Sequence, residues 1–400
     1  MASEITIDNT RPADLIARLQ DLAPRLENED DYDAKKEALQ ITKALTAQLE
    51  QPGNVAVDMI FSPMIAVTAR TAIDLNLYEH ILLEGPVTSA RLAVLSGADE
   101  LLIIRILRVL SAVHFVEEAA PRTWKATRIT AAMAVKEIAA GHRMVSQMIL
   151  PAVQTAPAFF AEQGYSCPTD PRDGLLQVAH NAKGSTVFEY MASRPSLLRD
   201  FNLFMGNTMG ARKYWVDWYP VQTRILDGAD PSGALIVDVG AGKGHDLVAF
   251  DEKFPGAGRL VLEDLAAVVE GLGVEDLDEK IERVAYDFFT EQPVKGARVY
   301  FYHHILHDWS DEYCLKILEN VTAVMTPGYS KLLVHEMIVP EQGASLFEGL
   351  LDMTVMAFNA GMERTKQQWR VLLEAAGLQV VSFWDSIDEG GDGIIEAMKV

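Results

Sequence analysis

The chain has 400 residues, 49% of them hydrophobic and 23% charged, which is the composition of a folded globular protein and excludes a disordered one. A single core rarely serves more than about 250–300 residues, so at least two domains are expected. The 57 acidic residues outnumber the 35 basic ones and leave a net charge of −22, which disfavours nucleic acid and anionic membranes as partners.

Cysteine content and the N-terminal segment limit the cellular location. The two cysteines, Cys167 and Cys314, are too few for a disulfide framework and fit a reducing compartment. The first residues lack a basic segment followed by an apolar one, and no consecutive run of about eighteen apolar residues occurs. We therefore expect a cytoplasmic protein with no membrane partner.

The first part of the chain is predicted to be helical. A one-sided apolar stripe recurs at i, i+4, i+7 and i+11, formed by Leu15, Leu19, Leu22 and Leu26. Similar stripes run through residues 35–50 and 59–81, and the acidic stretch 27–33 predicts a solvated turn.

Residues 87–130 have the pattern of a winged helix: a helix, a turn, a second helix and two short strands. Many winged helices bind DNA, but the second helix offers only Arg105 and Arg108, and the whole chain is acidic. The pattern therefore favours dimerisation. We predict a helical and winged-helix dimerisation domain over residues 1–130 and a homodimer.

The character of the sequence changes near residue 229. "GALIVDVGAGKG" is a buried strand running into a glycine turn, and further apolar strands follow at "RLVLEDL", "RVAYDFF", "RVYFYHHI", "KLLVHEMIV", "LQVVSFWD" and "GIIEAMKV". Helices separate most of them, which predicts an α/β domain with a mostly parallel, doubly wound sheet over residues 229–400. The last two strands are close in sequence, so the final strand is predicted to be antiparallel. Residues 131–228 are predicted to be a helical connector that contributes to the substrate pocket.

The glycine turn is compatible with a nicotinamide dinucleotide or with S-adenosylmethionine (SAM). Gly240 and Gly242 allow a ligand to approach backbone amides at a helix N-terminus. A dinucleotide fingerprint needs glycine at position 245, where this chain has His245. Instead Gly244 completes G-x-G-x-G, and Asp238 precedes the first glycine by two residues, a pattern typical of SAM sites.

An acidic residue at the end of the second strand is expected with either cofactor, because it holds ribose hydroxyls. Glu263 and Asp264 both occupy that position. The spacing alone does not choose between them.

The segment "HHILHDWSDEYC", residues 303–314, allows three interpretations. His303 and His307 have metal-ligand spacing for a helix, but the preceding residues predict a strand, in which they would lie more than ~13 Å apart. Ser310 can cap a following helix whose first turn holds two acids. His307 is then either a structural loop histidine or a site residue between a strand end and a helix start, where ligands bind in open α/β sheets.

Several motifs resemble, in order and spacing, the plant and fungal small-molecule O-methyltransferases of the caffeate and flavonoid type. They are "DVGAGKGHDLVAFDEKFP", "LEDLAAVV", "AYDFF", "ILHDWSDEYCLKIL", "LLVHEMIVP" and "GMERTKQQWRVLLEAAG", and the resemblance covers residues from about 60 to 400. It implies a Rossmann-like SAM-binding domain, a homodimer, SAM as cofactor and S-adenosylhomocysteine as its product.

The resemblance also implies a catalytic set. The histidine before "DW", His307, would be the general base, and Glu336 and Glu363 would orient it. A phenol with a pKa near ~10 is mostly neutral at pH 7, and general-base help is worth ~10²- to 10⁴-fold, so a histidine suits the proton removal. This chemistry requires no metal.

Cofactor contacts follow from the same resemblance. Asp264 would hold the SAM ribose, Asp287 and Phe288 would border the adenine, and Gly240 and Gly242 would line the methionine part. Asp238 is a further cofactor-binding candidate, from its place two residues before the first glycine. His303 stands where plant members often carry a lysine that contacts the cofactor, and its ring could donate one hydrogen bond.

The expected substrate is a small aromatic molecule, a polyketide-derived phenol such as a phthalide of the mycophenolic acid type. Its candidate contacts are Met205, Asp308, Met356 and Phe358. Two alternatives remain open: a SAM-binding pericyclase on the same scaffold, which has no need of a base flanked by carboxylates, and a non-catalytic winged-helix regulator.

Overall fold

The computed structural model describes residues 11–28, 31–206, 214–273, 277–386 and 391–400. The chain forms two compact units divided between Thr127 and Arg128. The predicted connector, residues 131–228, lies within the second unit.

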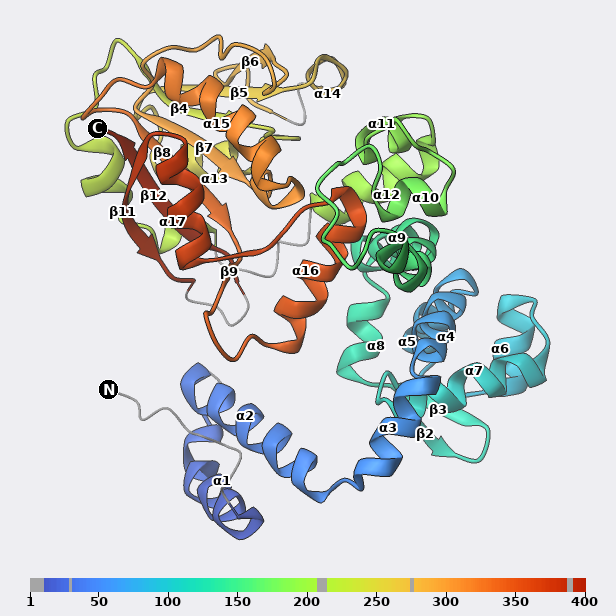
Figure 1. The fold of residues 1–400 in the computed structure, drawn as a ribbon. Helices are drawn as coiled ribbons and strands as arrows, with labels where there is room; N and C mark the ends of the chain where they lie inside the picture. The colour runs from blue at the N-terminus through green and yellow to red at the C-terminus, as the bar shows by residue number, and fades with distance from the viewer. Residues whose placement is uncertain (1–10, 29–30, 207–213, 274–276, 387–390) are drawn as a thin grey trace. The chain divides into compact units, whose positions relative to one another are not determined.

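The N-terminal unit is mainly helical and carries one small sheet (Figure 1). Its elements are α1 (Pro12–Leu26), α2 (Tyr32–Leu49), α3 (Pro52–Phe61), α4 (Pro63–Asp74), α5 (Leu77–Glu84), β1 (Val87–Thr88), α6 (Ser89–Ser96), α7 (Glu100–Ala112), β2 (Val116–Ala120) and β3 (Thr123–Ala126).

The leucine stripe predicted for the first helix is confirmed. Leu15 and Leu22 are buried between α1 and α2, and Leu19 and Leu26 pack beside them. The predicted acidic turn is too long, because α2 already begins at Tyr32. Asp31 accepts a hydrogen bond from the backbone N–H of Ala34, so this acid caps the helix.

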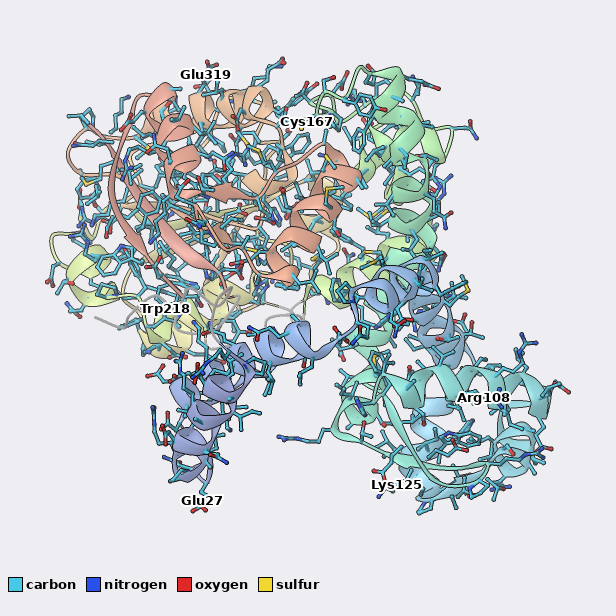
Figure 2. All side chains as sticks on the ribbon, turned by 60° about the horizontal axis from the view of Figure 1, so that its bottom comes forward. Glu27, Arg108, Lys125, Cys167, Trp218 and Glu319 are labelled. Atoms are coloured by element: carbon cyan, nitrogen blue, oxygen red, sulfur yellow. The ribbon has the colours of Figure 1, made fainter. Side chains whose placement is uncertain are left out.

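The predicted order of helix, turn, helix and two strands is present as α6, α7, β2 and β3. In this small sheet β3 is the central strand and pairs antiparallel with both β1 and β2. Arg105 and Arg108 are both exposed on α7, where Figure 2 labels Arg108.

The C-terminal unit holds a seven-stranded sheet in the order β11-β12-β8-β7-β4-β5-β6. Its strands are β4 (Ala234–Val239), β5 (Arg259–Asp264), β6 (Glu282–Ala285), β7 (Val299–His303), β8 (Lys331–Glu336), β11 (Leu378–Trp384) and β12 (Gly393–Lys399). β12 runs antiparallel to both of its neighbours, as predicted. The five strands β8, β7, β4, β5 and β6, in sheet order, are mutually parallel.

Helices cover both faces of this sheet (Figure 1). Apolar residues on one face pack against α15 (Asp311–Val324) and α17 (Lys366–Ala375), and those on the other face pack against α13 (His245–Lys253) and the segment around Trp215. Between β4 and β7 the strand order reverses direction, which is the switch point where open α/β sheets bind ligands.

The remaining elements of this unit are mostly helical. They are α8 (Arg128–Met133), α9 (Lys136–Glu162), α10 (Leu175–Ala179), α11 (Val187–Ala192), α12 (Pro195–Met205), α14 (Ala266–Glu270), α16 (Leu346–Asn359), the short strands β9 (Ile338–Val339) and β10 (Arg364–Thr365), and short helical turns at Trp215–Asp217, Gln222–Leu226 and Leu306–Asp308.

By length and composition alone, α9 could cross a membrane, and so could α3 with α4 if they formed one bent span. In this unit, however, α9 contributes buried residues such as Met148 and Ala152 to a core shared with α10, α12 and α16. One side of α9 therefore packs against other helices of this unit.

Candidate active site

The sheet brings distant residues to one edge. Gly240 follows β4, Asp264 ends β5, His303 ends β7 and Glu336 ends β8, and these strands are parallel neighbours. Their carboxyl ends therefore meet at the switch point.

His307 lies in the turn Leu306–Asp308, between β7 and α15, and it is buried. Its Nδ1 is 2.7 Å from Glu363 Oε1 and 3.5 Å from Glu336 Oε2. The structure thus brings together the three residues predicted as a catalytic set. With Nδ1–H donating to the Glu363 carboxylate, the lone pair of the neutral ring is on Nε2.

Glu336 organises the turn that carries the histidine. It is fully buried, so it is not the solvent-facing strand-end acid that its position alone would suggest. Its Oε1 accepts hydrogen bonds from the backbone N–H groups of Ile305, Leu306 and His307, at 3.1, 2.9 and 3.3 Å. One carboxylate therefore fixes the backbone of the turn while its other oxygen faces the ring.

The loop after α16 is fastened to the same turn. The backbone N–H of Met362 donates to the His307 carbonyl at 2.8 Å, and that of Glu363 donates to Asp352 Oδ1 at 2.9 Å. A Cβ at Gly361 would lie 2.8 Å from the carbonyl carbon of Asp308 and closer still to the His307 carbonyl oxygen. Only glycine allows this approach.

The charges around His307 favour its protonated form. Burial alone would lower the pKa of this histidine, but the attraction of Glu336 and Glu363 outweighs it and raises the pKa well above 6.5. Burial raises the pKa of Asp308 to about 7. The site therefore stabilises the imidazolium that forms when the histidine takes a proton.

Sequence reasoning missed Arg364, which is fully buried beside the turn. Its guanidinium donates to the carbonyl oxygens of Leu306 and Trp309, at 3.1 and 2.8 Å, and pairs with Asp311. Its place directly after Glu363 in "GMERT" was the available signal. Ser310 holds the N-cap position of α15 as predicted, but its Oγ donates to the Thr169 carbonyl and makes no cap bond.

The glycine turn joins β4 to α13 as predicted. Gly240 has φ of 73°, and a Cβ there would lie 2.5 Å from Ile305 Cδ1. Gly242 has φ of 56°, and a Cβ there would meet nothing within 4 Å. The first glycine allows the turn to pack against the histidine segment, and the second leaves open space beside its backbone.

Of the two acids at the end of β5, Asp264 faces this turn. Its carboxylate accepts from the backbone N–H groups of Gly242 and Leu265, at 2.8 and 2.7 Å. Glu263 is fully buried, and its carboxylate accepts a hydrogen bond from Gln292 Nε2 instead. The structure therefore decides what the spacing left open.

Asp238 lies buried under the glycine turn, and its Oδ2 has no hydrogen-bond partner among the described residues. Burial, followed by repulsion from Asp246, raises the pKa of Asp238 well above its ordinary value. An unpartnered carboxyl oxygen, an acid at the end of β5 and an open glycine backbone suit a ligand that carries both an amine and ribose hydroxyls. The residues present therefore fit SAM.

The two predicted adenine contacts follow β6. Asp287 is exposed, and its carboxylate accepts from the backbone N–H of Phe289. Phe288 is half-buried, with its ring 5.9 Å from Trp309 at 83°. Phe288 thus lies close to Trp309, two residues before the start of α15.

The ring of His303 is bonded on one side, because its Nδ1 lies 2.7 Å from Asp246 Oδ2. Its ring centroid is 4.2 Å from that of His335.

Two of the predicted substrate residues, Met356 and Phe358, lie in an aromatic and sulfur-rich cluster. Phe358 stacks on Phe201 at 5.9 Å and 9° and meets Phe188 edge to face at 5.8 Å. Met356 packs against the same cluster, and Met205 is the last residue of α12, 38% exposed. Phe188 and Phe201 belong to the stretch that begins "FEYMASRPSLLRDFNLFM", whose aromatic residues could line a pocket for a flat ring but equally predict core.

Asp308 lies next to the base, with its carboxylate oxygen 3.7 Å from His307 Nε2. The donor atoms of His307, Glu336 and Glu363 also lie within 4.8 Å of one another, a spacing that could accommodate a metal ion. In this structure, however, His307 Nδ1 and Glu363 Oε1 form a 2.7 Å hydrogen bond with each other.

The O-methyltransferase domain model matches residues 172–379, more than half of the chain. O-methyltransferase penC of Penicillium thymicola is 63% identical over 390 residues, 97% of each chain. The chain belongs to the O-methyltransferase family. O-methyltransferase asqD of Emericella nidulans is 60% identical over 341 residues, covering 84% of this methyltransferase and 87% of its relative.

Solved structures share the fold. LepI in complex with SAM is 27% identical, with a TM-score of 0.87 over 98% of this chain and 100% of that chain. OxaC with S-adenosylhomocysteine and oxaline is 26% identical, with a TM-score of 0.85 over 97% and 99%. A structure described as a pericyclic reaction enzyme is 27% identical, with a TM-score of 0.86 over 97% and 99%. The protein is a SAM-dependent O-methyltransferase of fungal secondary metabolism, with the Rossmann-like fold predicted from its sequence.

Proposed function

We propose that this methyltransferase methylates a phenolic hydroxyl of a small aromatic molecule, with His307 as general base. The observation that carries the proposal is the buried His307 with Nδ1 on Glu363 and its Nε2 left to accept a proton. SAM supplies an electrophilic methyl group on a positively charged sulfur.

The chain's own residues prepare the acceptor oxygen. His307 Nε2 takes the phenolic proton, and Glu363 and Glu336 stabilise the resulting imidazolium while Glu336 holds the turn in place. This follows the logic of a carboxylate that fixes the tautomer and orientation of a catalytic histidine. General-base help of this kind is worth ~10²- to 10⁴-fold.

Cofactor binding is assigned to the turn after β4 and the end of β5. Asp264 holds ribose hydroxyls, Asp238 and the open backbone at Gly242 receive the methionine part, with Gly240 beside them, and the loop after β6 borders the adenine. Asp287 and Phe288 are the residues of that loop.

The acceptor is proposed to be a flat aromatic ring, such as a polyketide-derived phenol or phthalide. The stacked pair of Phe201 and Phe358, with Met356 nearby, offers the apolar surface that such a ring needs. Met205 and Asp308 are further candidate contacts, and the helical segment 131–228 contributes to this region.

The working form is proposed to be a cytoplasmic homodimer. In the N-terminal unit, α3 buries none of its residues, and large apolar side chains such as Met59, Ile60 and Phe61 are exposed, with Met64 on α4. A second copy of the chain would cover this apolar surface. A single-chain mass in light scattering at micromolar concentration would contradict the dimer.

The function is tested by incubating the purified protein with methyl-labelled SAM and a panel of phenolic polyketides, followed by mass spectrometry. We expect a product heavier by one methylene group with the wild type and a loss of ~10²-fold or more with His307→Ala. A matched control is His114→Asn, at an exposed position in the N-terminal unit. A rearranged product without added methyl would instead support a pericyclase, the alternative favoured by the similarity to a pericyclic reaction enzyme.

A further inference from the structure

A second cluster of ionisable groups lies outside the proposed catalytic set. It consists of His303 at the end of β7, His335 on β8 and Asp392 just before β12. All three side chains are buried, with side-chain exposure of 8% for His303 and 2% for Asp392, and His335 is 3% exposed.

Strand register explains why these residues meet. His303 on β7 pairs directly with His335 on the parallel strand β8, and His335 pairs with Ile394 on the antiparallel strand β12. Side chains at paired positions point to the same face of a sheet. Asp392 is two residues from Ile394, so the backbone alternation directs it toward that same face.

The donor atoms converge and are incompletely used. One ligand atom from each of the three residues lies within 4.8 Å of the other two. His303 Nε2 and His335 Nδ1 are buried, and neither has a hydrogen-bond partner among the described residues. Leaving a buried nitrogen without a hydrogen bond costs about 1–3 kcal/mol. Two such nitrogens on neighbouring histidines therefore indicate a site for a ligand that both can bind.

The surroundings supply the outer contacts of a metal site. His303 uses its other nitrogen, Nδ1, on the Asp246 carboxylate at 2.7 Å, and His304 Nε2 lies 3.1 Å from Asp392 Oδ1. A histidine that binds a metal through one nitrogen commonly donates its other N–H to a carboxylate, which fixes the ring.

We propose that His303, His335 and Asp392 bind a divalent transition-metal ion, with zinc as the best-fitting choice. Two imidazole nitrogens and one carboxylate oxygen form a donor set that zinc accepts, with a further position for water. Zinc bonds of about 2.0–2.1 Å place tetrahedral donors roughly 3.3 Å apart, so donor atoms that lie within 4.8 Å of one another must close by at most about 1.5 Å on binding.

The ion would tie together the carboxyl end of β7, that of β8 and the start of β12. His303 is thereby assigned to the metal rather than to the cofactor, in place of the hydrogen bond predicted from the sequence. The catalytic set is a separate group of donors, because His307 lies in the turn after β7 and pairs with Glu363. The proposed ion thus lies outside the catalytic set, and the proposal goes beyond methyl transfer.

The test uses the full-length protein, freed of metal with a chelator and desalted. Addition of zinc chloride followed by desalting and elemental analysis should give one zinc ion per chain. Cobalt chloride should give visible absorption bands of a nitrogen and oxygen site. Zinc should also raise the thermal unfolding midpoint of the wild type, and a chelator should reverse the rise.

Variants distinguish this site from other donors. His335→Phe keeps a ring of similar size and should weaken zinc binding at least ~10-fold, as second-sphere or ligand loss does in other sites. Asp392→Asn provides a second variant if the first does not fold. His307→Ala, which removes the catalytic donors, and the exposed His114→Asn should both retain one zinc ion.

The outcomes separate clearly. A wild-type protein that retains no stoichiometric zinc overturns the proposal whatever the variants do. Zinc that is lost with His307→Ala but kept with His335→Phe would place the ion at the catalytic set and also overturn it. None of these three readouts involves methyl transfer, so failure of the proposed function leaves the metal test intact.

Discussion

The hydrogen bond between Glu363 and His307 should determine how kcat/KM depends on pH. Burial would lower the pKa of His307, but the two glutamates raise it well above 6.5. A general base works only when deprotonated, so kcat/KM should rise as the pH increases through this raised pKa. The acidic limb of the wild-type profile is therefore expected above pH 6.5.

Glu363→Gln keeps the size of the side chain and removes its charge. A hydrogen bond to a charged group is worth about 1.5–3 kcal/mol, and one pKa unit corresponds to about 1.36 kcal/mol. The substitution should therefore lower the pKa of His307 by about 1–2 units and move the limb to lower pH. A weaker base also transfers the proton less well, so the plateau should fall, but by less than the ~10²- to 10⁴-fold expected for complete loss of the base.

The measurement is the initial rate of transfer from methyl-labelled SAM to an acceptor found in the phenol panel, across a broad pH range. Glu374→Gln, which removes an exposed acid on α17, is the matched control and should leave the profile unchanged. An unmoved limb together with a wild-type plateau in Glu363→Gln would refute the assignment of Glu363 as the partner of the base.

Three further predictions concern other parts of the site and fold. Gly361→Ala should lower kcat at least ~10-fold with a smaller change in SAM affinity, because its Cβ would strike the carbonyl of His307; equal loss in both, measured by kinetics and calorimetry, would point to general unfolding. Asp264→Ala should weaken SAM binding by ~10-fold or more in calorimetry, since a hydrogen-bonding carboxylate is lost, and unchanged affinity would remove it from the cofactor site. Glu396→Ala should reduce the free energy of unfolding by about 3–5 kcal/mol in urea, because Glu396 is fully buried and pairs with Arg224 and Lys331; a loss within the error of extrapolation would contradict this.

The sequence by itself determined the sheet and its cofactor turn. Continuous apolar runs with intervening helices predict buried parallel strands, and the short link before the last strand predicts its antiparallel direction, because these features are local. Gly240 and Gly242 could be identified because a tight turn needs positive φ at fixed spacing. His307, Glu336 and Glu363 came together only through resemblance to a family, since residues separated by up to 56 positions carry no spacing signal.

Only the tertiary structure decided how side chains are used. It turned Asp264 rather than Glu263 toward the glycine turn, gave Ser310 a partner at Thr169 instead of a cap, and buried Glu336 under three backbone N–H groups. It also set His303 beside His335, because β7 and β8 are separated by a helix along the chain and become neighbours only when the sheet forms.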